Sequence, residues 1–139
     1  MNNEKGISTL GGLLIIIAFL MFLPVLTSIM NIYTTYRDLN QIASVTTGIA
    51  KKNGGFNYEV MNVYYDLLAE YNIDTSKLDT VFYPGVNIKV NKREALGMEL
   101  KHDMKFSIVQ LDKSALSYEF VLLVRQSTYS QRFFRPSEL

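Results

Sequence analysis

The sequence contains no cysteine and only one histidine, His102. The absence of cysteine excludes disulfides, thiolate metal sites and thiol nucleophiles, and a single histidine leaves no imidazole cluster for zinc. The sequence also has no large excess of either charge, since it contains 14 Lys and Arg residues and 13 Asp and Glu residues. That balance excludes a disordered polyelectrolyte. It gives no support for a nucleic-acid partner, because nucleic-acid binding depends on clustered positive charge.

Charged side chains are missing from the whole stretch between Lys5 and Arg37. Within it, residues 10–30 contain only two polar side chains, one Thr and one Ser. A helix of this length, rising about 1.5 Å per residue, extends roughly 30 Å, which is the thickness of the hydrocarbon core of a bilayer. A cleaved signal peptide would have a shorter apolar region and then a small-residue cleavage site, and no such site follows Met30. A buried core helix is the third alternative; we predict a retained transmembrane helix at 10–30.

The position of this segment also suggests an orientation. Lys and Arg residues near its two ends show no strong bias. A short tail ahead of a span usually stays in the cytoplasm, so residues 1–9 are expected to be a cytoplasmic tail or leader. The long C-terminal part is then expected to lie outside the cytoplasm, which predicts a single-pass protein of the cytoplasmic membrane.

The helical pattern continues past the predicted anchor. Apolar residues recur at spacings of three and four through residues 32–50, and a pair of glycines follows, so we expect an aqueous helix extension over 31–53. Its apolar stripe packs either on the chain's own head or on neighbouring subunits. The sequence of an apolar helix face does not show which of these surfaces covers it. We predict that the head covers one flank and that Tyr36, Leu39 and Ala43 form a partner-helix face.

Residues 54–139 are predicted to form a small α+β head. An amphipathic helix is expected between its N-cap Asn57 and a stop at Asn72 or in the turn that begins at Asp74. Apolar residues then alternate with polar ones, which predicts three antiparallel strands covered on one face by the amphipathic helix. The expected strands are a short one within 86–90, one over 98–108 and one over 116–124. Both faces of 121–124 are apolar, which predicts that the last strand is central.

No catalytic site can be assembled from the sequence. His102 alternates in phase with apolar neighbours, and an isolated His in that position is expected to be a packed core residue. Glu99 and Asp103 alternate with lysines, which indicates a charge ladder on the solvent face of a strand. We therefore predict a protein that is not an enzyme and has no cofactor and no metal site.

The N-terminal region carries a family resemblance. Lys5-Gly6, directly before a long apolar helix, resembles the start of type IV pilins and pseudopilins. The Leu23-Pro24 step, the aromatic-rich exit, the small-residue helix over 32–50 and the closing strands resemble, more narrowly, the TadE-like pseudopilins of tight-adherence systems and their Gram-positive relatives. The resemblance implies that a prepilin peptidase cuts between Gly6 and Ile7, and that the freed helix packs into a filament or secretion machine.

One position departs from the family pattern. Most pilins and TadE-like subunits have a Glu five residues after the cleaved glycine, and this chain has Gly11 there. A carboxylate in lipid is expensive and is kept for a pairing role. Its absence suggests a minor or initiating subunit, or a chain that is never cleaved.

The sequence therefore predicts a structural, minor subunit of a pilus-like or tight-adherence-type envelope assembly. Its expected partners are membrane lipid, other pilin-like or secretion subunits and a prepilin peptidase. The alternative is an unprocessed single-pass interaction module of a conjugation or secretion apparatus. An anchored enzyme is a third class, which has only His102 in its favour. The mature N-terminus, Ile7 or Met1, separates the first two.

Overall fold

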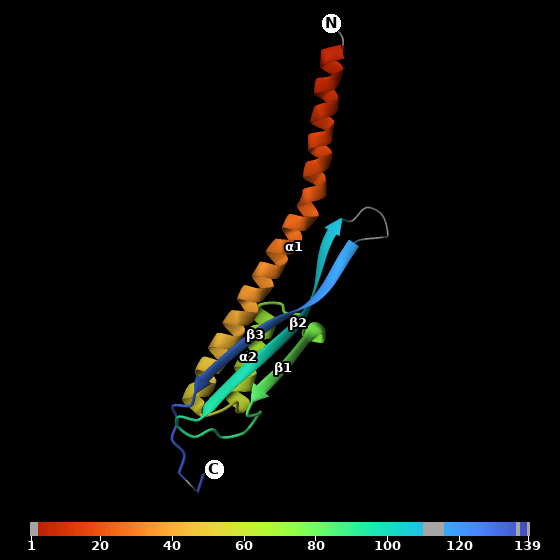
Figure 1. Ribbon diagram of the computed structural model, residues 1–139. Coiled ribbons are helices and arrows are strands. Elements are labelled where there is room, and N and C mark those ends of the chain that lie inside the picture. The colour runs from red at the N-terminus through yellow and green to blue at the C-terminus, as the bar shows by residue number, and fades with distance from the viewer. Residues whose placement is uncertain (1–2, 110–115, 136, 139) are drawn as a thin grey trace. The chain divides into compact units, whose positions relative to one another are not determined.

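The computed structural model describes residues 3–109, 116–135 and 137–138 (Figure 1). The chain has the predicted α+β fold: a long N-terminal helix, a second helix and a three-stranded antiparallel sheet. In chain order its elements are α1 (Asn3–Asn53), α2 (Tyr58–Glu70), the 3₁₀ turn η1 (Thr75–Lys77), β1 (Leu78–Tyr83), β2 (Ala95–Val109) and β3 (Leu116–Tyr129).

The chain divides into two compact units. One contains residues 1–33 and 105–120, and the other contains residues 34–104 and 121–139. We call the second unit the head. It includes the C-terminal part of α1, which the sequence assigned to a separate extension over 31–53.

Helix α1 is continuous through Pro24 and ends where the sequence predicts. Lys51 and Lys52 occupy its last turn, where cations are favoured by the helix dipole. The chain then leaves the helix at Gly54, whose φ of 73° is a left-handed conformation that glycine adopts at little cost. The amide of Gly55 donates to the carbonyl of Ala50 at 3.0 Å, which closes the helix end.

Helix α2 also has the predicted boundaries. The Asn57 side chain accepts from the amide of Val60 at 3.0 Å and is the N-cap, with Glu59 in the first turn. The helix stops before Asn72, whose positive φ of 52° turns the chain away. Its buried face consists of Val60, Met61, Tyr64 and Leu68.

The first strand lies earlier in the chain than predicted. Strand β1 pairs with β2 in the register Leu78↔His102 to Tyr83↔Gly97. The expected strand within 86–90 is wrong, because only Val86 forms an isolated bridge, with Phe56. The amides of this segment are used elsewhere: Asn87 and Val90 donate to carbonyls in the α1–α2 connection, at 2.8 and 2.7 Å.

The order of the strands is β1-β2-β3, so the prediction that the last strand is central is also wrong. The doubly apolar stretch of β3 lies at an edge of the sheet, where Val121 and Leu123 are exposed and Val124 is buried. Strand β2 is central, and the consecutive residues 96–100 are all buried. Both faces of β2 are therefore covered in this stretch, although one of the covered residues is Glu99.

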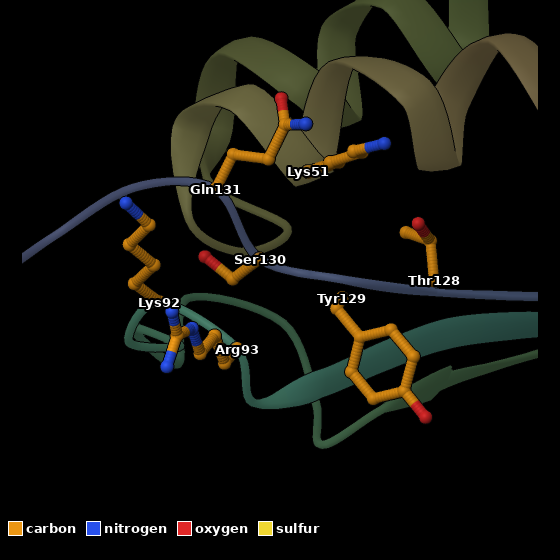
Figure 2. A pocket seen from close by; sticks show the side chains of 7 residues that line it. All are labelled: Lys51, Lys92, Arg93, Thr128, Tyr129, Ser130 and Gln131. Carbon is orange, nitrogen blue, oxygen red and sulfur yellow. The ribbon is translucent and has the colours of Figure 1, made fainter.

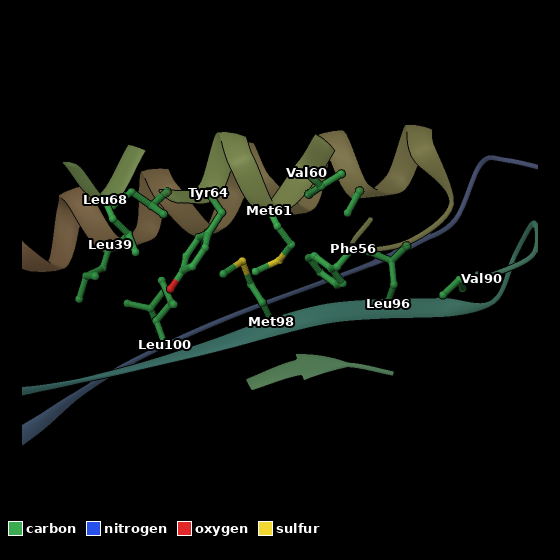
Figure 3. Close-up of a cluster of buried hydrophobic side chains, with 14 residues drawn as sticks. Leu39, Phe56, Val60, Met61, Tyr64, Leu68, Val90, Leu96, Met98 and Leu100 are labelled. Atoms are coloured by element: carbon green, nitrogen blue, oxygen red, sulfur yellow. The ribbon is translucent and has the colours of Figure 1, made fainter. Parts of the chain in front are cut away.

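The core of the head lies between the two helices and one face of the sheet (Figure 3). Phe82 packs against the rings of Phe56 and Tyr64, at centroid distances of 4.9 and 5.5 Å. The Tyr64 hydroxyl shares a 2.7 Å hydrogen bond with that of Thr80 on β1. Fully burying an apolar side chain such as Phe56 contributes about 1.5–3 kcal/mol to the stability of the fold. The contribution of α1 to this core is Leu39, Ile42, Ala43 and Ala50.

Candidate functional site

The apolar part of α1 presents its side chains outward. Thirteen large apolar side chains between Leu13 and Met30 are each 41–72% exposed. The most apolar window of the helix has a mean hydropathy of 2.7, and none of it is buried within the structure. This is one helix near the N-terminus that is long and apolar enough to cross a membrane.

The polar groups of this stretch are compatible with an apolar environment. Pro24 lacks an amide hydrogen, and the helix continues past it. The Thr27 hydroxyl donates to the carbonyl of Leu23 at 3.0 Å, which satisfies the hydroxyl within the helix itself. Satisfaction inside the same helix is the condition for burying such groups in lipid.

The predicted cleavage site lies in the first turns of α1. The helical backbone includes both Gly6 and Ile7. Gly11, which departs from the pattern of the pilin-like proteins that the sequence resembles, is followed by Gly12, and a Cβ added at either position would meet nothing within 4 Å. The absence of a carboxylate at Gly11 is therefore not a consequence of crowding within the chain.

The predicted partner face is corrected by the packing of the head. Leu39 and Ala43 are 0% exposed and belong to the chain's own core. They are buried because this part of α1 packs against α2 and the sheet. Tyr36 remains 47% exposed, and Val45 in the same part of α1 is 38% exposed. Because nine residues make two and a half helical turns, these two exposed side chains lie on opposite sides of α1.

His102 lies in the core, in phase with the buried Leu100 on β2. It stands opposite Leu78 of β1, and its Nδ1 has no hydrogen-bond partner in the described part of the chain. Burial lowers the pKa of His102, and the nearby Lys77 lowers it further. The residue is a neutral, packed imidazole. No group of three His, Asp or Glu side chains that could hold a metal occurs among the described residues.

Glu99 corrects the predicted charge ladder. Its side chain is only 6% exposed, although it points away from the core. Arg125 of β3 donates to Glu99 from Nε at 2.8 Å and also through its terminal nitrogen, and Lys101 lies 3.1 Å away. These cations, Arg125 foremost, lower the pKa of the Glu99 carboxyl. Glu99 therefore forms ion pairs both along β2, with Lys101, and across to β3, with Arg125. Alternation of residues within one strand cannot predict the pair between strands.

Comparison with family models, curated proteins and solved structures finds no match for this chain.

Proposed function

We propose that the protein is a membrane-anchored structural subunit of a pilus-like or tight-adherence-type envelope assembly, with its head outside the cytoplasm. The observation that carries the proposal is that two parts of α1 have different surroundings. One part of the helix exposes a bilayer-length apolar surface, and the other part supplies four residues to the core of the head. A single helix that is both anchor and scaffold suits a subunit that holds a small domain at a membrane.

The head supports a structural role more than a chemical one. Glu99 is held in ion pairs with Arg125 and Lys101, and His102 is packed in the core, where its Nδ1, like the hydroxyls of Thr46 and Thr47, has no hydrogen-bond partner among the described residues. Val45 is an exposed apolar side chain on α1 that a neighbouring subunit can contact, and Tyr36 is another on the opposite side of the helix. Gly48 lies one turn beyond Val45, is exposed, and has open space at its Cβ, so another helix can approach closely there.

The resemblance at Lys5-Gly6 adds a processing step to the proposal. A prepilin peptidase would cut before Ile7 and leave a chain that begins in the apolar helix. The absence of a carboxylate at Gly11 favours the second candidate, an unprocessed single-pass interaction module of a conjugation or secretion apparatus.

The mature N-terminus distinguishes the two candidates. The full-length chain is purified from membranes of cells that contain the envelope machinery, and its intact mass and N-terminal sequence are determined. A chain that begins at Ile7 supports the pilin-like subunit, and Gly6→Leu should then remain uncut. A chain that keeps Met1 in the parent protein supports the unprocessed module.

Contact with neighbouring subunits is tested by placing a photoreactive amino acid at single positions of α1. Tyr36 and Val45 should give crosslinks between copies of the chain, or to an identified pilin-like subunit. Leu39 is the matched control, because it lies in the same helix segment but its side chain is buried in the core of the head. Equal crosslinking at all three positions, or none at the exposed two, would contradict the proposed contacts with neighbouring subunits.

A further inference from the structure

The head contains a shallow hollow of about 470 Å³ at the end of α1 (Figure 2). Three of its seven lining residues are cations: Lys51 in the last turn of α1, and Lys92 and Arg93 in the connection that leads into β2. The others are Thr128, Tyr129, Ser130 and Gln131, which end β3 and continue beyond it.

Backbone hydrogen bonds hold these segments together. The amide of Gln131 donates to the carbonyl of Lys51 at 2.9 Å. On the other side, the amide of Arg93 donates to the carbonyl of Ser130, and the amide of Ser130 to that of Glu94, both at 2.9 Å. The chain after β3 is thus fixed between the end of α1 and the turn that carries Lys92 and Arg93. The cations are held on opposite sides of one segment by the fold itself.

The three cations that line the hollow have no counter-ion among the described residues, and the same is true of Lys52, Lys89, Arg132 and Arg135 elsewhere in the head. Lys77, Lys101 and Arg125 are each paired with a carboxylate. Among the residues that the structure describes, no carboxylate lies within 4 Å of the charged groups of the three hollow-lining cations. The nearest acidic residue in sequence, Glu94, directs its carboxylate to the amide of Asn91 at 2.9 Å instead.

The hollow also offers neutral donors. Thr128, Tyr129 and Gln131, whose side chains carry hydroxyl and amide groups, are also among its lining residues. Ser130 is committed to the framework, because its buried hydroxyl donates to the carbonyl of Val90 at 2.8 Å. Ammonium and guanidinium groups together with hydroxyl and amide donors form the donor set that binds phosphate-type oxyanions.

We propose that this hollow is a binding site for a phosphate group, with Lys51, Lys92 and Arg93 as its charged ligands. The site does not depend on the proposed assembly function, since it uses only residues of the head. Its ligand is recognised as a phosphate oxyanion, whether that oxyanion is free or part of a lipid headgroup.

The test uses the full-length chain in phosphatidylcholine nanodiscs. Inorganic phosphate is titrated at low salt, and chemical shifts or heats are recorded. Saturable binding is expected, and Lys51→Gln or Lys92→Gln should weaken it by about tenfold each, as loss of a charge-assisted hydrogen bond implies. Binding should also weaken as NaCl approaches about 0.1 M, because exposed charges are screened. Lys51→Arg should restore most of the affinity.

Lys52→Gln is the matched control. Lys52 is the next residue of the same helix turn, is exposed, and does not line the hollow. Its variant should bind phosphate as the parent does. Each variant is melted without phosphate, and unchanged melting temperatures show that the head is intact. Equal weakening in the Lys52 variant, or no saturable binding of any probe, would overturn the proposal.

A parallel arm separates the two sources of phosphate. The nanodisc-embedded chain is mixed with phosphatidylcholine vesicles with and without phosphatidylglycerol. Binding to the anionic vesicles alone, lost in Lys51→Gln and kept in Lys52→Gln, would support the site and identify a headgroup as the source. Vesicle binding that ignores both substitutions would contradict it.

Discussion

Two buried polar residues of β2 tolerate burial in opposite ways. Glu99 stays charged because Arg125 and Lys101 surround it, and these partners lower the pKa of its carboxyl. His102 stays neutral because burial lowers its pKa, and the carboxylate of Asp74 does not outweigh burial and Lys77. The strand therefore carries a charge on its outer face and an uncharged imidazole in the core, with no catalytic pairing of the two.

The inward position of His102 could be predicted from alternation alone, because the neighbouring Leu100 fixes the phase of the strand. The burial of Glu99 could not. It depends on Arg125, a residue 26 positions away that only the pairing of β2 with β3 brings near. Alternation in the sequence predicts which face of a strand a residue lies on, but the residue that pairs with it from the neighbouring strand depends on the tertiary structure.

Replacement of His102 tests its role. His102→Leu should keep or raise stability, by about 1 kcal/mol, because it removes a buried nitrogen without a hydrogen-bond partner. His102→Gln should lower stability, since it leaves a polar group in the same place. Thermal or denaturant unfolding of the full chain measures both. A function lost in the Leu variant without any change in unfolding would instead indicate a chemical role.

The pH dependence of stability gives a second readout of the same residue. Its folded pKa is lowered, so the unfolded chain binds more protons between the two pKa values. The stability that depends on His102 is therefore complete above the unfolded pKa, about 6.5, and is lost as the pH falls through the folded value. His102→Leu should flatten this part of the profile. The carboxyls of Glu99 and Glu119, whose pKa values are lowered, act at more acidic pH and should be unaffected.

At the scale of elements, β2 and β3 leave no room for a side chain at one glycine. A Cβ added at Gly97 would lie 2.6 Å from the carbonyl oxygen of Gln126 and 3.2 Å from the Cα of Ser127. Both are backbone atoms, so the strands themselves would have to separate. Gln126 also ties β3 to α1, since its side-chain amide donates to Asn40 at 2.8 Å. The position of β3 against the helix thus depends on a small residue in β2.

Gly97→Ala should therefore destabilise the head by about 1–3 kcal/mol, as overpacking does. Gly48→Ala is the control, because Gly48 lies in α1 with open space at its Cβ. That change should stabilise the chain by about 0.5–1 kcal/mol through helix propensity. Chemical denaturation of both variants is the measurement. A neutral Gly97→Ala would show that the strands have more room than the structure gives them.

The helices were predictable from the sequence and the edges of the sheet were not. Capping at Asn57 and the glycine after α1 are local signals, and both helices end where those signals predict. The segment 86–90 alternates like a strand, yet its amides bond to the α1–α2 connection instead of the sheet. The apolar stretch at 121–124 reads as a central strand, but it lies at an edge because β2 supplies both pairings.

The C-terminal part of α1 is core for the head, and its removal is the clearest test of that point. Leu39→Ala should cost about 2–5 kcal/mol, the range for a fully buried Leu, and Leu39→Asp should prevent folding. A fragment of residues 54–139 should fail to unfold cooperatively, whereas residues 34–139 should do so. Circular dichroism melts compare the two. A cooperative melt of the shorter fragment would show that the head does not need the helix.

At the scale of the whole molecule, the chain combines a membrane-length apolar helix with a head that uses the same helix as scaffold. The length of the uncharged stretch made it predictable that α1 contains a helix long and apolar enough to cross a membrane. The partner surface was not, since an apolar stripe looks the same whether the chain's own head or another subunit covers it. Burial of Leu39 and Ala43 resolves that ambiguity for most of the stripe.

The central claim of the proposed function is that α1 crosses the membrane and holds the head outside the cytoplasm. Because the chain has no cysteine, single cysteines can be labelled without background. Cells that make the full-length chain are treated with a membrane-impermeant maleimide. Tyr58→Cys, at a strongly exposed site of α2, should be labelled in intact cells, and Leu39→Cys only after denaturation. A Tyr58→Cys head that resists labelling until the membrane is permeabilised would contradict the account.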